Sequence, residues 1–260
     1  TANGTTSLPF ELDTGNWIYS GLLFENFSGA PEGGLPPGWA SVHEGGDTAV
    51  AWGRSNKFCG ATGLYHPGGG GTDPTRHERA VSPPIVIPPA ATAHRVILDL
   101  WICTETEDDP DFNVLAYDGL TLRVVDETTG RALRSVLAEA FAPRIKSGTG
   151  VFPPGYGYPD HLPKHLPRSG HPGYFQDMSV WAGSTRGLKP IYIELDGIQG
   201  STVRLSFDYT QDGSGTCLDA GHAGSPPGTC GVLVGGFQLR SVANETAYAE
   251  VFFLAVSATP

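Results

Sequence analysis

The sequence predicts an all-β protein, built as a two-sheet antiparallel sandwich, and three observations carry this prediction. Apolar and polar residues alternate over short runs, which is the pattern of half-buried strands. The 36 Gly and 22 Pro residues separate these runs with turns and loops. With 39% hydrophobic residues, a chain of 260 residues is able to bury a substantial core. We expect about ten to thirteen strands and almost no helix.

Alternating apolar residues mark the individual strands, most clearly at 95–104, 117–126, 189–195, 202–209 and 231–239. Strand-like runs at 41–43 and 48–53 precede a turn-rich segment at 54–79. A strand bracketed by prolines at 80–89 belongs at a sheet margin, because proline cannot donate to the ladder. Residues 131–141 favour a helix by composition, but their place after a strand and a turn favours a strand, which we expect.

The chain shows no internal repeat and no domain boundary, so we expect one sandwich with additions. Residues 22–240 form the sandwich, and residues 143–175 are an insertion rich in Pro, Gly, Tyr and His. A loop this long in a compact domain is usually functional or interfacial. Residues 1–21 form an N-terminal arm, and residues 241–260 add a very apolar strand at 248–256.

The charge balance limits the classes of partner. The 16 basic and 27 acidic residues give a net charge of −11, which argues against nucleic acid and anionic membranes and suits divalent cations. No apolar run approaches the roughly 20 residues of a membrane span, so we expect no membrane insertion.

The four cysteines predict disulfides. Cys217 and Cys230 enclose a Gly/Pro-rich loop between two strand-like runs, which predicts a local bond, and Cys59 and Cys103 are then left to pair across the sheet. Four cysteines allow three pairings, and the other two stay open. No spacing is the C-x-x-C of zinc or redox sites. An even set of paired cysteines predicts an extracellular or cell-surface location.

Several motifs together resemble a known family. FENF followed by LPPGW (residues 24–39), then VSPPIVIP, LDLWI, YDGLTLRVVDETTG and GVLVGGFQL, are similar in content and order to the MAM-like jelly-roll modules of secreted bacterial proteins, the cleaved-adhesin and choice-of-anchor J group. The resemblance covers residues 22–240 and implies a jelly-roll sandwich. Val234–Gly236 departs from the family, which often carries an Ile-Asp-Asp cluster there, so no role of those acids carries over.

The resemblance also implies a structural Ca²⁺ near Glu25, with Asp47 and Asp118 as further oxygen donors. Ca²⁺ takes roughly six to eight oxygen ligands, some of them backbone carbonyls, so a few carboxylates on adjacent loops suffice. The alternative is that the acidic loops are solvated and that Glu25 accepts hydrogen bonds from backbone amides.

Catalytic signals are weak, and we expect no enzyme. His43-Glu44 and His77-Glu78 begin like zincin motifs but lack the second histidine. Paired carboxylates such as Glu194-x-Asp196 are the minimum for a glycoside hydrolase, but alternating acids are common on exposed strands. His161, His165 and His171 lie among prolines that give no helix to align them on a metal, so we expect surface histidines.

Two groups of residues are candidates for an interaction surface. Aromatic residues in the loops are able to stack on sugars or on a protein partner; they are Tyr65, Tyr156, Tyr158, Tyr174, Phe175 and Trp181, of which Tyr156, Tyr158 and Tyr174 are the best candidates. For each one taken singly, packing under a long loop is the alternative. The N-terminal arm carries the alternating apolar residues Leu8, Phe10 and Leu12. An apolar strand at 248–256 is unsuited to an unprotected sheet edge.

These features favour an extracellular, non-enzymatic subunit that assembles with copies of itself by donating a terminal strand, which gives a filament or coat. The alternative is an adhesin module of a larger secreted protein that binds carbohydrate or a host surface. A glycoside hydrolase using Glu194 ranks last.

Overall fold

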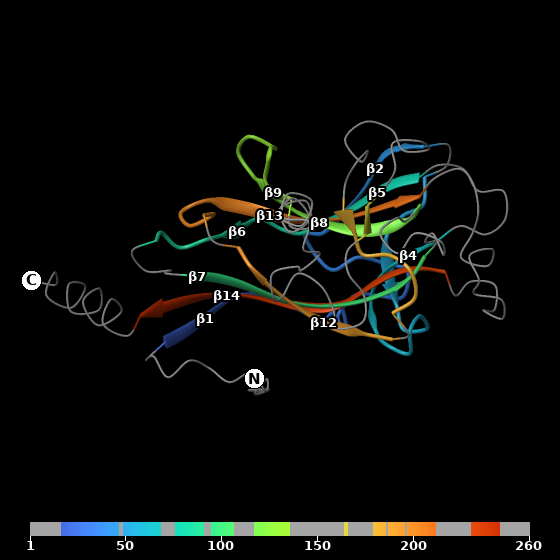
Figure 1. The fold of residues 1–260 in the computed structure, drawn as a ribbon, viewed down its shortest axis with the longest axis horizontal. Coiled ribbons are helices and arrows are strands. Elements are labelled where there is room, and N and C mark those ends of the chain that lie inside the picture. The colour runs from blue at the N-terminus through green and yellow to red at the C-terminus, as the bar shows by residue number, and fades with distance from the viewer. Residues whose placement is uncertain are drawn as a thin grey trace, which may run out of the picture.

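The computed structural model describes most of the predicted sandwich. The described residues are 17–46, 49–68, 76–90, 95–106, 117–135, 164–165, 179–185, 187–195, 197–211 and 230–244. They form two antiparallel sheets that face each other as two layers (Figure 1). The predicted all-β, two-sheet jelly-roll sandwich is therefore confirmed. Within the described part of the chain, no helix is long and apolar enough to cross a membrane.

The first sheet is organised around β14 (Gly231–Asn244), whose run of Val, Leu and Phe residues is buried. One edge of β14 pairs with β7 (Arg95–Glu105), and the other edge is shared by β4 (Gly63–Pro67) and β1 (Trp17–Glu25). The outer positions belong to β12 and β3. Their bounds are Lys189–Glu194 and Gly53–Ser55.

The second sheet is organised around β13 (Thr202–Gln211). One edge of β13 pairs with β8 (Gly119–Asp126), and the other with β5 (Arg76–Val81) and the short β6 (Ile85–Val86). The outer strands of this sheet are β2 (Ala40–Gly46) and β9 (Ala132–Ser135). A separate two-stranded sheet consists of β10 (Lys164–His165) and β11 (Ser179–Val180). The chain passes repeatedly from one large sheet to the other, as a jelly roll does.

An aromatic cluster fills the space between the two sheets. The Trp39 ring stacks on Phe207 of β13 with ring centres 6.2 Å apart, and it meets Phe237 of β14 at 6.0 Å. Phe27, just after β1, makes an edge contact with Trp39 at 5.4 Å. The apolar positions of the alternating strands thus point into one shared core, as their period of two requires.

The segment 179–185 joins the two sheets at one side of the sandwich. Trp181 exchanges two backbone hydrogen bonds with Leu120 of β8, and the Thr185 N–H donates to the Thr104 carbonyl of β7. The Trp181 side chain is 0% exposed and belongs to the core. Its predicted place on an interaction surface is therefore wrong. Its position in a loop suggested exposure, but pairing with β8 turns the ring inward.

Several element bounds differ from the sequence predictions. β4 lies inside the segment expected to be turns, and residues 49–52, expected as a strand, have no regular structure. The predicted domain bounds at 21 and 240 fall inside β1 and β14, because these two strands stay paired as far as Trp17 and Asn244. β9 confirms a strand within 131–141 at Ala132–Ser135, while 136–141 and the predicted strand at 248–256 lie outside the described residues.

Candidate functional site

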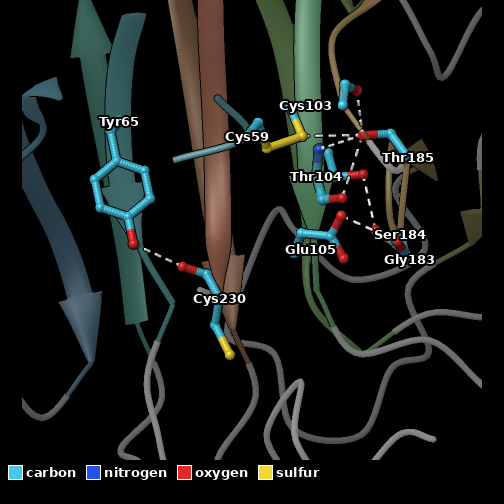
Figure 2. Close-up of a disulfide and its surroundings, with 10 residues drawn as sticks. Cys59, Tyr65, Cys103, Thr104, Glu105, Gly183, Ser184, Thr185 and Cys230 are labelled. Carbon is cyan, nitrogen blue, oxygen red and sulfur yellow. Dashed lines mark hydrogen bonds between the residues drawn. A yellow bond between two sulfur atoms is a disulfide. The ribbon is translucent and has the colours of Figure 1, made fainter. Parts of the chain in front are cut away.

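A disulfide fixes the loop between β3 and β4 to the first sheet. Cys59 in this loop is bonded to Cys103 in β7, as predicted (Figure 2). Cys59 adopts a positive φ of 54°, which is uncommon for a residue with a side chain. Cys230 is also disulfide-bonded, and its predicted partner Cys217 lies outside the described residues.

Tyr65 on β4 stands beside this crosslinked loop. Its ring packs on Phe58 with centres 4.7 Å apart. Its hydroxyl donates a hydrogen bond of 2.7 Å to the Cys230 carbonyl, toward which it points in Figure 2. Burial raises the pKa of Tyr65 to about 12, so the phenol stays neutral and remains a donor. The Tyr65 side chain is half-buried, so part of it remains exposed to solvent.

A surface hollow of about 350 Å³ opens in front of Tyr65. Its walls come from the loop after β1 with Glu32 and Gly33, from Ala51 and residues 53–55, and from Tyr65 with Pro67. The hollow therefore combines one aromatic ring with charged and hydroxyl side chains. We name it the β3 hollow.

The loop after β1 extends the sheet beside β3 and so forms one wall. The Gly33 N–H donates to the Arg54 carbonyl at 2.8 Å, and the Arg54 N–H donates to the Gly34 carbonyl at 2.7 Å. A side chain at Gly53 would meet the Gly33 carbonyl oxygen at 2.4 Å, so the close approach requires glycine there. Across this junction, Arg54 Nη1 donates to Glu32 Oε2 at 3.1 Å.

Two of the three residues predicted to bind calcium, Glu25 and Asp118, lie among the described residues. Glu25 Oε1 accepts a hydrogen bond of 2.6 Å from the Phe27 N–H, which is the alternative arrangement expected from the sequence. Asp118 is buried, its carbonyl accepts from Thr106 Oγ1, and Asp47 lies outside the described residues. No group of three or more His, Cys, Asp or Glu side chains among the described residues is placed to hold a metal. Calcium binding stays a prediction.

Most of the predicted interaction residues lie outside the described residues. They are Leu8, Phe10, Leu12, Tyr156, Tyr158 and Tyr174. Glu194, the candidate hydrolase residue, forms an ion pair with Arg95 at the surface. His43 of the incomplete zincin motif lies 3.0 Å from Glu78 of the other motif.

Sequence reasoning missed Glu32 and Arg54. They are 22 positions apart and meet only because the loop after β1 runs alongside β3. Gly53, which permits that approach, and Gly33, whose φ is 72°, were the signal that could have found them.

Comparisons with known proteins show low similarity. The sequence matches no protein-family profile and no curated protein sequence. Among solved structures, the K3 cleaved adhesin domain of Lys-gingipain from Porphyromonas gingivalis is 10% identical, with a TM-score of 0.39 over 86% of this chain and 99% of that domain. A family 61 carbohydrate-binding module in complex with β-1,4-galactotriose is also 10% identical, with a TM-score of 0.35 over 85% of this chain and 99% of that one.

Proposed function

We propose that the chain is an extracellular, non-catalytic module that binds carbohydrate in the β3 hollow. The hollow carries this proposal. Its volume of about 350 Å³ lies within the usual range of small-ligand sites, and polar groups and an aromatic ring converge on it.

The chemistry of the β3 hollow suits a sugar. Arg54 supplies N–H donors and Glu32 supplies acceptors, and together they match the paired hydroxyls of a pyranose ring. The Tyr65 ring offers an apolar face for the C–H groups of the sugar. Because the carboxylate is held by the arginine, the acceptor is oriented before the ligand arrives, which lowers the entropy cost of binding.

The cysteine chemistry supports the extracellular part of the proposal. The Cys59–Cys103 bond and the disulfide-bonded Cys230 persist in oxidising compartments and are rare in the cytosol. A secreted module is expected to meet glycans rather than nucleic acid, given the net charge of −11.

An oligosaccharide array tests the proposal. We expect the wild type to bind at least one glycan, and Glu32→Ala to weaken that binding about ten- to hundredfold, because a lost hydrogen bond to a charged group is worth about 1.5–3 kcal/mol. Glu127→Ala is the matched control, since Glu127 is also an exposed glutamate paired with an arginine, Arg204, on the other sheet. No binding by the wild type, or equal losses in the two variants, would contradict the proposal.

Self-assembly is the second candidate, and the edge of the first sheet favours it. β1 pairs with β14, and no strand among the described residues pairs with the other edge of β1. Phe24 on this strand is 63% exposed. An unpaired edge is a template for a strand from another copy. Residues 1–16 of the arm and the predicted strand at 248–256 lie outside the described residues.

A further inference from the structure

We infer that Glu78 and His66 act as a clamp that positions residues 50–52, the segment that brings Ala51 to the wall of the β3 hollow. This inference rests on the proposed function for its consequence in binding, but its geometry stands by itself. Residues 50–52 have no regular structure, and they lead directly into Gly53 of β3. Ala51 and Gly53 both line the hollow.

Glu78 provides the contact with the backbone N–H of Val50. It lies on the inner face of β5, opposite Tyr209, and is 1% exposed. Its Oε1 accepts a hydrogen bond of 2.9 Å from the Val50 N–H and lies 3.0 Å from Nδ1 of His43. A buried carboxylate is costly unless it is paired, and the contacts with Val50 and His43 provide these partners.

His66 holds the carbonyl side of the same residue. Its Nε2 lies 3.2 Å from the Val50 carbonyl oxygen, so this nitrogen carries the donated proton. The imidazole is fully buried and is packed against Trp52 at 5.3 Å and Tyr209 at 4.4 Å. Because His66 lies on β4 and Glu78 on β5, the Val50 backbone is hydrogen-bonded to side chains of both sheets.

A third contact holds the chain two residues further on, at Trp52. The Trp52 N–H donates to Ser41 Oγ of β2 at 3.0 Å, and the Trp52 ring is buried. Backbone groups outside a ladder need such partners when they are buried. Residues 50–52 therefore take their conformation from side chains of β2, β4 and β5, and Ala51 is placed at the hollow as a result.

The clamp makes Glu78 a positioning residue for a site that it does not line. Glu78→Leu removes the acceptor for the Val50 N–H, while Glu78→Gln keeps an oxygen acceptor and loses the charge. We expect hydrogen exchange at the Val50 and Trp52 amides to accelerate about tenfold or more in Glu78→Leu, and much less in Glu78→Gln. Binding to the oligosaccharides that the wild type selects on the array should weaken in the same order.

Asp99→Leu is the matched control, because Asp99 is another buried carboxylate that is paired with an arginine, Arg240. Asp99 and Arg240 both lie in the first sheet, whereas Glu78 lies in the second. Ser41→Ala provides a second variant if Glu78→Leu fails to fold. Faster exchange confined to residues 50–52 in the Glu78 and Ser41 variants supports the clamp. Exchange that rises equally across the protein, or equally in Asp99→Leu, overturns it. If exchange changes as expected but the wild type binds no oligosaccharide, the clamp is supported and the proposed function fails.

Discussion

At the scale of single residues, Glu25 and Phe27 determine how the chain enters the core. Phe27 has a φ of 58°, a conformation that bulky residues avoid. This reversal turns the ring inward, where it meets Trp39 and Phe237. The Glu25 carboxylate stabilises the reversal by accepting the Phe27 N–H. The carboxylate therefore has a structural role that needs no metal.

Removing this carboxylate separates the two interpretations of Glu25. We expect Glu25→Ala to lower the free energy of unfolding by about 1.5–3 kcal/mol, the value of a hydrogen bond to a charged group. Chemical denaturation with EDTA and with added Ca²⁺ measures it. A loss that is equal in both conditions fits the hydrogen bond, whereas a loss seen only with Ca²⁺ identifies Glu25 as a metal ligand.

Trp181 has a packing role that a second substitution tests. Because its side chain is fully buried between the sheets, Trp181→Ala should lower the free energy of unfolding by about 3–5 kcal/mol. Leu133→Ala, at an exposed position of β9, should change it by no more than about 0.5 kcal/mol. Urea titrations of both variants give the comparison. Unchanged stability in Trp181→Ala would restore its predicted place on the surface.

At the scale of elements, the turn between β8 and β9 is set by one side chain. Asp126 Oδ1 accepts hydrogen bonds from the Thr129 N–H at 2.7 Å and from its hydroxyl at 2.8 Å. The Asp126 N–H also donates to the Arg131 carbonyl, which closes the hairpin. The hydrogen bonds from Thr129 hold the pKa of Asp126 below its ordinary value.

This lowered pKa predicts a direction for the effect of pH. Because the folded state favours the ionised carboxylate, its stabilising contribution is present above about pH 5 and is lost as the pH falls through the lowered pKa. An NMR titration of the Asp126 carboxyl should give a midpoint below that of an unstructured peptide. In Thr129→Val the midpoint should move up toward the ordinary value. No movement would show that the Thr129 hydroxyl is not the cause, because the backbone N–H of residue 129 remains in this variant.

At the scale of the whole molecule, the two proposed functions predict different sizes in solution. A carbohydrate-binding module needs no second copy, so we expect a monomer by size-exclusion chromatography and no fibres by negative-stain electron microscopy. Regular fibres that disappear when residues 1–13 are deleted would instead establish self-assembly through the N-terminal arm. Because residues 1–13 precede β1, their deletion removes no residue of the two sheets, and the stability of the shortened protein serves as the control.

The sequence by itself determined the sandwich and one of its disulfides. The alternation of apolar residues located β7, β8, β12, β13 and β14, because a strand with one face in the core must repeat every two residues. It also predicted the Cys59–Cys103 bond. It missed β4, whose five residues lie in a segment rich in glycine and carry little periodicity.

The tertiary structure alone decided the β3 hollow and the inward place of Trp181. Glu32 meets Arg54, and Glu78 and His66 meet the Val50 backbone, through contacts between strands of different sheets and loops far apart in the chain. Periodicity reports which face of a strand is apolar, but not which loop lies beside which edge. Those neighbours are fixed by long-range pairing and close packing, which a local pattern does not encode.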